Sequence, residues 1–201
     1  MDWLERFRRF GAVQDGHFLL TSGLHSSVYV QSALILQHPE EAAALGQALS
    51  ERVVHTRPDL VVGPALGGIV VAHEVARALG CRAIFAERAD GVMQLRRGFA
   101  VRPGERALVA EDVITTGGSV EEVAALVRAP GAHIVGFAAL IDRSAGRARF
   151  DPPLAALITL DLPVFPPEAC PLCRKGEPVS KPGSRARPAA PAVGSPRLHS
   201  H

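Results

Sequence analysis

The sequence predicts an α/β domain with a mostly parallel sheet. Along residues 60–160, short apolar runs of strand length alternate with amphipathic stretches of helix length, and this alternation is typical of βαβ units. The chain has 201 residues, of which 47% are hydrophobic, and this suits one domain of ordinary size with a well-filled core. We expect this domain to span residues 1–174, followed by a tail over residues 175–201.

The part of the chain before the alternating region predicts a helix, two short strands and a longer helix. Residues 3–10 have the pattern of a short helix that stops at Gly11. The β-like runs 17–20 and 28–31 flank a Ser-Gly turn, and residues 40–55 carry apolar side chains at helical spacing.

The alternating region supplies the predicted sheet and its helices. We expect strands at 60–62, 82–86, 107–110, 134–141 and 154–160, and helices at 68–79, capped by Gly80, and at 120–128. Ligands of such a sheet bind at the carboxyl ends of the strands. The loops that follow Val62, Ala86, Ala110 and Ile141 are therefore the expected ligand loops.

Composition excludes several classes of protein. Residues 175–201 contain five Pro and no aromatic residue, which predicts a disordered tail because such a segment buries little apolar surface. Of the 22 basic and 20 acidic residues, five basic and one acidic lie in that tail, so residues 1–174 carry a net charge of −2. We therefore expect no nucleic-acid partner for the folded body.

Neither a membrane span nor a secretory leader is expected. No apolar run approaches the roughly 20 residues of a transmembrane helix, and the first residues, MDWLERFRRFG, do not have the pattern of a signal peptide. Three cysteines without a secretory context favour a reducing cytoplasm over a disulfide scaffold.

The most informative stretch is the loop that follows the strand at 107–110. Two acids, Glu111 and Asp112, end the apolar run, and a turn rich in hydroxyls and glycine leads into the helix. Backbone N–H groups, hydroxyls and a helix N-terminus together form a cradle for a phosphate monoester. The residues of this cradle are Thr115, Thr116, Gly117, Gly118 and Ser119. The spacing of Ser119 and Glu122 further predicts a capping box.

The acid pair narrows the ligand to a sugar phosphate. A P-loop requires a Gly-Lys-Ser/Thr run and a dinucleotide site requires an early GxGxxG run, and both are missing here. Carboxylates beside a phosphate cradle would repel the anion unless they bind hydroxyls or a metal. A sugar phosphate whose hydroxyls lie over Glu111 and Asp112 satisfies both halves of the loop. The plain alternative is a polar strand-to-helix turn.

At this point the chain resembles a known family. Val109–Ser119 resembles the phosphoribosyl-diphosphate motif of the type I phosphoribosyltransferases, and this implies their fold, a mostly parallel five-stranded sheet flanked by helices under a small hood. The hood would comprise residues 1–36 and a C-terminal segment. Four further stretches resemble the orotate phosphoribosyltransferase family: residues 18–26 its hood turn, 62–68 its pyrophosphate loop, 85–99 its mobile loop and 139–143 its orotate-binding segment.

The resemblance implies a reaction and a set of residues. The enzyme would join orotate to phosphoribosyl diphosphate, giving orotidine 5′-phosphate and pyrophosphate in pyrimidine synthesis. Mg²⁺ would bind the diphosphate and the ribose hydroxyls near Asp112, and the enzyme would be a homodimer whose mobile loop serves the neighbouring site. The residues implied are Glu111 and Asp112 for the ribose, Arg88, Arg96 and Arg97 for the pyrophosphate, Gly67 and Gly68 for the diphosphate, Ser22 and Tyr29 in the hood, and Arg143 for the orotate carboxylate.

Three of these assignments have structural alternatives. Gly67 and Gly68 also suit a tight packing turn, residues 87–98 a solvated charged loop, and Arg143 a surface ion pair. Two rival functions also remain: transfer to another base, and a non-enzymatic regulator that binds phosphoribosyl diphosphate and contacts nucleic acid.

The chain departs from the family at its lysines. Many family members have lysines in the hood turn, the pyrophosphate loop and the mobile loop, whereas here Thr21, Gly67 and arginines occupy those places. Arginine stabilises a diphosphate but is a poor proton donor, because it stays charged at any usual pH.

One CxxC pair remains outside this assignment. Cys170 and Cys173 supply two ligands of the four that a structural zinc site needs, and Cys81, a histidine or a second subunit could complete such a site. A redox pair and an inert pair are the alternatives. Taken alone, His17, His25 and His38 have the pattern of turn or surface histidines, with His25 the better ligand candidate because it lies in the hood stretch.

Overall fold

The N-terminal elements form largely where the sequence predicts them. A computed structural model describes residues 2–182. Helix α1 spans Trp3–Arg9, strands β1 and β2 span Val13–Leu19 and His25–Val30, and helices α2 and α3 span Ala33–Leu36 and Pro39–Val53. Pro39 lies in the first turn of α3, where its missing N–H removes no hydrogen bond. The short helix α2 has no counterpart among the predicted elements.

Six strands make up the main sheet within residues 2–182, in the order β5-β4-β3-β6-β7-β8. Neighbours from β4 to β8 are parallel, which confirms the five-stranded parallel sheet, and β5 adds an antiparallel edge beside β4. The strands are β3 (Leu60–Pro64), β4 (Arg82–Ala89), β5 (Val92–Leu95), β6 (Arg106–Ile114), β7 (His133–Asp142) and β8 (Leu154–Thr159).

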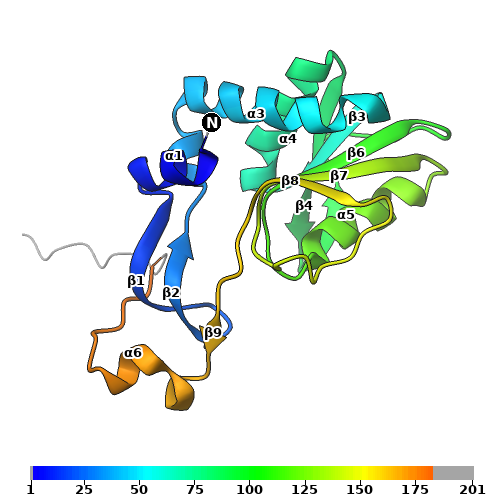
Figure 1. Cartoon of the computed structure of the whole chain (residues 1–201). Helices are drawn as coiled ribbons and strands as arrows, with labels where there is room; N and C mark the ends of the chain where they lie inside the picture. Colours follow the sequence, from blue (N-terminus) through cyan, green and yellow to red (C-terminus); the bar gives the residue numbers. More distant parts are fainter. Residues whose placement is uncertain (1, 183–201) are drawn as a thin grey trace, which may run out of the picture.

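Helices cover both faces of this sheet (Figure 1). Helix α4 (Gly67–Leu79) connects β3 to β4, and α5 (Gly118–Arg128) connects β6 to β7. Helices α3 and α4 bury one apolar core, which includes Leu49 and Val75, while α5 buries a second, which includes Val123 and Phe137. Gly80 ends α4 in the left-handed conformation, with φ 72°, as the sequence predicts. Among residues 2–182, no helix has both the length and the apolar character needed to cross a bilayer.

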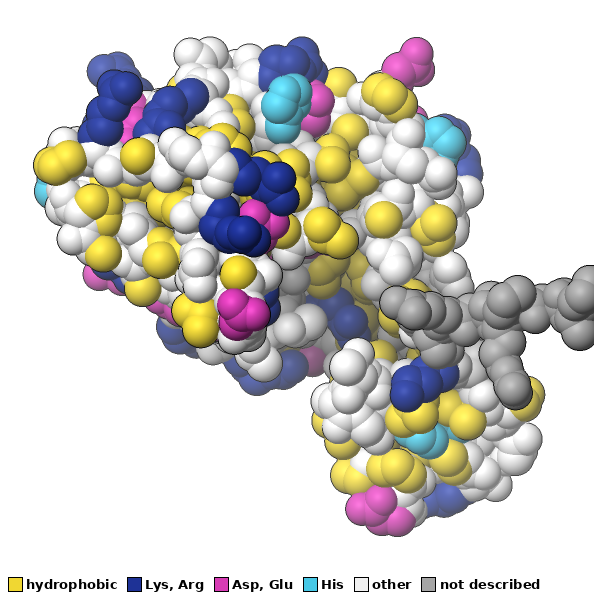
Figure 2. All heavy atoms as spheres, turned by 180° about the vertical axis from the view of Figure 1, so that it is seen from behind, with side chains coloured by type: hydrophobic (Ala, Val, Ile, Leu, Met, Phe, Trp, Pro, Cys, Tyr) yellow, Lys and Arg dark blue, Asp and Glu magenta, His cyan; other side chains and the backbone are white. Residues whose placement is uncertain are grey.

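A second, smaller sheet forms the hood lobe, which we define as β1, β2 and the described residues after β8. Its strand order is β1-β2-β9, where β9 (Val164–Phe165) runs antiparallel to β2. The chain then continues through a 3₁₀ turn (Pro167–Ala169) and helix α6 (Pro171–Arg174). Figures 1 and 2 show this lobe set apart from the body that holds the main sheet.

After α6 the chain returns along the other edge of β1. The Ser180 N–H donates to the His17 carbonyl, and the Ser180 carbonyl accepts from the Leu19 N–H, both at 2.8 Å. This pairing lies beyond the boundary at residue 174 that the sequence predicts, so the first residues of the expected tail belong to the hood lobe. Residues 183–201 lie outside the described part of the chain.

The hood lobe overturns the expectation for two histidines. His17 and His25 are 5% and 6% exposed, so the prediction of turn or surface histidines is wrong for both. The reason is the hairpin, which packs both rings against Cys170 and Cys173. His38 is exposed, as predicted.

Candidate active site

The phosphate cradle lies where β6 passes into α5. Gly117 has φ 87°, a conformation that glycine adopts without strain, and α5 begins directly after it. A cavity of ≈ 50 Å³ is lined by Glu111 and by residues 113–120. This cavity is small and is formed mostly by backbone and hydroxyl groups, so it suits a phosphate group better than a base.

One local prediction fails at this cradle. The N-cap of α5 is Gly117, and no side chain caps the helix, so Ser119 and Glu122 do not form a capping box. Ser119 lies inside the first turn of the helix, and the Glu122 carboxylate instead accepts a hydrogen bond from Arg88 at 2.7 Å. The N-cap residue supplies no side-chain acceptor, and the Gly118 N–H has only a 3.5 Å contact with Thr116 Oγ1, so an anion can bind the N–H groups at the start of α5.

The glycine pair that opens α4 lies against the acid pair. A Cβ at Gly67 would fall on the Asp112 carboxylate, and a Cβ at Gly68 would lie 3.1 Å from Glu111 Oε1. The side chain that many relatives carry at the position of Gly67 therefore has no room here while Asp112 keeps its place. The close approach also means that the phosphate cradle and the glycine pair share one edge of the sheet, at the ends of β3 and β6.

Burial controls the charge of Glu111. Glu111 is 8% exposed, and burial, with a hydrogen bond and the charge of Asp112 adding to it, raises the pKa of Glu111 to about 10. Glu111 is therefore protonated at neutral pH in the absence of ligand. A neutral side chain lining the cradle does not repel a phosphate, and this removes the conflict that two carboxylates would create.

Asp112 is positioned by a residue that sequence reasoning missed. The Ser32 hydroxyl, buried at the start of α2, donates a hydrogen bond to Asp112 Oδ2. This contact spans 80 residues of sequence, so no local motif could have indicated it. It connects the acid pair to the segment that follows the hood hairpin.

Arg143 follows the end of β7 and turns toward the hood. Its backbone N–H donates to the Ile114 carbonyl at 2.8 Å, so it lies beside the end of β6. Its Nε atom is buried and has no hydrogen-bond partner. Burial lowers the pKa of Arg143, and the nearby Tyr29 side chain acts in the opposite direction. An anionic ligand would supply the missing acceptor, and a surface ion pair does not describe this residue.

A further residue missed from the sequence shapes this turn. The Asp142 carboxylate, 4% exposed, accepts hydrogen bonds from the backbone N–H groups of Ser144 at 2.7 Å and Gly146 at 3.2 Å. These bonds satisfy the backbone of the loop around Arg143 without using the Arg143 side chain. Arg147, in the same loop, is exposed and pairs with Asp161 at 3.4 Å.

The loop that resembles the family's mobile loop is a β-hairpin made of β4 and β5. Pairing between β3 and β4 ends at Ala86, so the hairpin extends past the carboxyl end of β3. The three arginines of residues 85–99 bind acids: Arg88 binds Glu122 at 2.7 Å, and Arg96 and Arg97 approach Glu87 at 3.8 and 3.0 Å. To contact a leaving group, these side chains must exchange those partners.

The structure thus brings together most of the implied residues at one edge of the main sheet. The cradle, the glycine pair, the acid pair and Arg143 lie at the ends of β3, β6 and β7, and Tyr29 approaches Arg143 from β2. Ser22 is exposed in the hood turn, and the structure does not bring it together with these groups.

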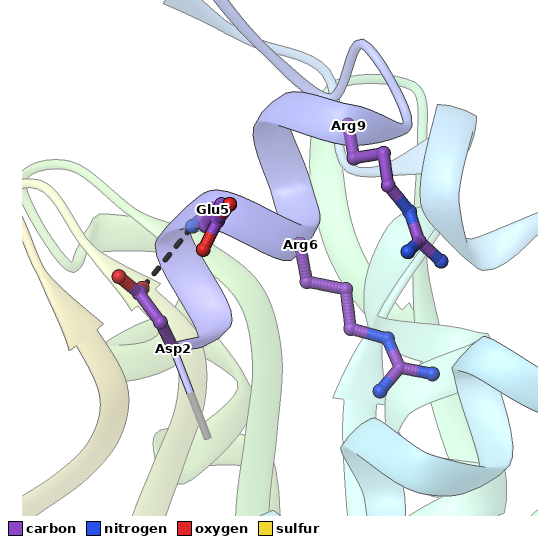
Figure 3. Close-up of a pocket in the computed structure, with 4 residues that line it drawn as sticks. All are labelled: Asp2, Glu5, Arg6 and Arg9. Carbon is purple, nitrogen blue, oxygen red and sulfur yellow. Dashed lines mark hydrogen bonds between the residues drawn. The ribbon is translucent and has the colours of Figure 1, made fainter.

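A larger hollow beside α1 belongs to none of these loops. It measures ≈ 350 Å³ and is lined by Asp2, Glu5, Arg6 and Arg9, as Figure 3 shows. Asp2 caps α1 there by accepting from the Glu5 N–H at 3.1 Å, and Arg6 pairs with Glu41. Asp2 and Arg6 are therefore engaged in local structure.

Comparisons with known proteins agree with this geometry. Residues 31–159 match the family described as the phosphoribosyl transferase domain. An orotate phosphoribosyltransferase of Thermotoga petrophila is 51% identical over 181 residues, 90% of this chain and 97% of that protein. An orotate phosphoribosyltransferase of Heliobacterium modesticaldum is 52% identical over 184 residues, 90% of this chain and 96% of its own.

Solved structures give the same result. The crystal structure of Mycobacterium tuberculosis orotate phosphoribosyltransferase superposes with a TM-score of 0.64 at 25% identity, covering 78% of this chain and 93% of that one. The phosphate cradle, the sheet and the close sequence relatives lead to one conclusion. The chain belongs to the phosphoribosyltransferase family and, within it, to the orotate phosphoribosyltransferases.

Proposed function

We propose that this protein transfers the phosphoribosyl group of phosphoribosyl diphosphate to orotate, giving orotidine 5′-phosphate and pyrophosphate in pyrimidine biosynthesis. The observation that carries the choice of base is Arg143, whose buried Nε has no partner beside the phosphate cradle. Orotate differs from the neutral bases by its carboxylate, and a guanidinium binds a carboxylate through paired, charge-assisted hydrogen bonds. A neutral base would leave the buried Nε–H of Arg143 without a charged acceptor.

The two anionic ends of the sugar substrate have separate places. Thr115, Thr116 and the start of α5 receive the 5′-phosphate through hydroxyl and backbone donors. The diphosphate lies beside Gly67 and Gly68, at the start of α4 and next to the acid pair. The ribose then lies between them, over Glu111 and Asp112.

The donor set beside the glycine pair fits a magnesium ion. Asp112 offers hard carboxylate oxygens of the kind that Mg²⁺ prefers, and together with the diphosphate and the ribose hydroxyls it would hold the ion. When bound, Mg²⁺ offsets negative charge on the diphosphate as a Lewis acid.

The protein's own residues promote the reaction by positioning the substrates and by stabilising the charges that develop. The C1–O bond to the diphosphate breaks while a ring nitrogen of orotate forms the new bond to C1. The electron pair of the broken bond leaves with pyrophosphate, which also takes up the proton that the ring nitrogen loses. The acid pair holds the ribose hydroxyls while positive charge develops on the ring. Arg88, Arg96 and Arg97, once released from Glu87 and Glu122, cover the departing pyrophosphate.

We further propose a homodimer in the cytoplasm. The hairpin of β4 and β5 extends past the carboxyl end of β3. A projecting hairpin of this kind suits a loop that serves the site of a neighbouring subunit. The three cysteines are free thiols in the structure, as a reducing compartment maintains them.

Base selection tests the proposal directly. The protein is mixed with Mg²⁺ and phosphoribosyl diphosphate, and loss of orotate absorbance is followed beside parallel assays with uracil, adenine and hypoxanthine. We expect turnover with orotate alone. Arg143→Ala should raise the KM for orotate about tenfold or more, because a charge-assisted pair contributes roughly 1.5–3 kcal/mol, and should change the KM for phosphoribosyl diphosphate little.

The matched control is Arg147→Ala, which removes an exposed arginine of the same loop and should leave both KM values unchanged. Equal effects of Arg143→Ala on both substrates would remove Arg143 from the base site. Preferred turnover of a purine would overturn the choice of base, and binding of phosphoribosyl diphosphate without turnover of any base would favour a regulator.

A further inference from the structure

Four potential metal ligands meet inside the hood lobe, away from the phosphate cradle. His17 lies on β1, His25 begins β2, and Cys170 and Cys173 lie at the start of α6 and within it. Each offers one ligand atom, and the four atoms all lie within 4.8 Å of one another. The histidines and the cysteines that they contact lie 148 to 156 residues apart in the sequence. The fold therefore brings the cluster together.

Three of the separations fit ligands around one tetrahedral ion. With Zn–N and Zn–S bonds of about 2.0–2.3 Å, neighbouring ligand atoms lie about 3.3–3.8 Å apart. His17 Nε2 lies 3.5 Å from Cys170 Sγ and 3.7 Å from Cys173 Sγ. His25 Nδ1 lies 3.3 Å from Cys173 Sγ. The two ring nitrogens, 2.8 Å apart, need to separate by about half an ångström to match this geometry.

A backbone contact orients one of the rings for metal binding. His17 Nδ1 lies 2.8 Å from the Glu177 carbonyl oxygen, and only a protonated Nδ1 makes a hydrogen bond to a carbonyl. His17 Nε2 then carries its lone pair toward the other three ligand atoms. Metal-binding histidines in proteins have this arrangement, in which the second ring nitrogen donates to a carbonyl or carboxylate.

The hood lobe also lacks the apolar core that would otherwise hold its C-terminal segment. Across residues 161–182 the one buried residue is Cys170, and no residue of this segment belongs to either apolar core of the body. The strand β9 has two residues. A segment with so little buried surface needs a cross-link to stay ordered, and small lobes use disulfides or metals for this purpose.

We propose that His17, His25, Cys170 and Cys173 bind one Zn²⁺ ion that fastens the C-terminal segment to the hood hairpin. Two thiolates and two imidazoles in a tetrahedral arrangement are typical of zinc. Cys173 Sγ contacts both histidines, so the four ligands surround one point; a two-iron cluster would keep the histidines on one metal and the cysteines on the other. Four protein ligands leave no open position, so this ion has a structural role.

Metal content of the full chain tests the proposal. The protein is produced without a polyhistidine tag, dialysed against metal-free buffer and analysed by mass spectrometry of the elements. We expect one zinc ion per chain in the wild type and in two matched controls, Cys81→Ser and His55→Gln, which alter a cysteine and a histidine outside the cluster. Cys173→Ser and His25→Gln should each lose most of the zinc.

Two further measurements keep the test conclusive if one of the variants fails to fold. Co²⁺ exchanged into the site should give the intense visible bands of a tetrahedral complex with thiolate charge transfer. A strong chelator should lower the Tm of the wild type by several degrees and leave the Tm of Cys173→Ser unchanged. Three results would each overturn the proposal: wild-type protein with no more zinc than the variants, an octahedral Co²⁺ spectrum, or a Cys170–Cys173 disulfide in freshly purified protein.

Discussion

Ionisation at single residues decides what the site can bind. Glu111 lines the phosphate cradle and yet is neutral at pH 7, because burial raises its pKa to about 10. The Nε atom of Arg143 is buried and has no acceptor. Glu111 therefore does not repel an anion, and Arg143 requires one as a partner. Together they suit two substrates, one that carries a phosphate and one that carries a carboxylate.

The raised pKa of Glu111 has a consequence for stability. Its ordinary pKa is 4.5 and its native pKa about 10, so between these values the native state binds more protons than the unfolded state, and stability falls as pH rises. Glu111→Gln removes this titration. We expect the variant to match the wild type in Tm near about pH 5 and to exceed it increasingly toward about pH 9.

Glu105→Gln is the matched control, with the opposite sign. Burial raises the pKa of Glu105, but hydrogen bonds and charges from Arg102 and Arg82 outweigh it, so the net pKa is lowered. That carboxylate stabilises the protein above its ordinary pKa, and the stabilisation is lost as pH falls. Thermal unfolding followed from about pH 3 to about pH 9 checks both variants. A difference between wild type and Glu111→Gln that does not change with pH would show that Glu111 keeps an ordinary pKa.

At the scale of the element, the parallel strands of the main sheet could be predicted from the sequence, whereas the antiparallel strand β5 could not. Strands β3, β6 and β7 are apolar and buried, so their pattern is visible in the sequence. Strand β5 has four residues with mixed burial and exists through its pairing with β4. The same holds for the site: local motifs located the cradle and Arg143, whereas Ser32, His17 and His25 act through partners far along the chain.

The role proposed for Arg88, Arg96 and Arg97 can be tested by chemical modification. The chain has two lysines, Lys175 and Lys181, and neither lies in the hairpin or the cradle. Amine acetylation should therefore leave turnover within about twofold, while an arginine-selective dicarbonyl should inactivate, with protection by phosphoribosyl diphosphate and Mg²⁺. The variant with Lys175→Arg and Lys181→Arg should respond in the same way. If acetylation inactivates the wild type but spares this variant, a lysine takes part in the reaction.

At the scale of the whole molecule, the proposed dimer decides which subunit's arginines act at a given site. Arg88→Ala and Asp112→Asn should each reduce turnover strongly when alone. If the hairpin serves the neighbouring subunit, mixing the two variants restores activity, since each mixed dimer then has one site with both residues intact. Random exchange gives at most about a quarter of the wild-type rate. A mixture no more active than its components would mean that the hairpin covers the site of its own subunit.

The pairing of the hood hairpin also has a consequence for the order of folding. Strands β1 and β2 are among the first residues that a ribosome synthesises, but their edge partners, β9 and Ser180, lie more than a hundred residues later in the chain. During synthesis both outer edges of the hairpin lack these partners, while the main sheet can already fold from residues 60–159. Such open edges are where chains pair with one another. The hood is therefore the last part of the protein to close, and the nascent chain is most exposed to aggregation there.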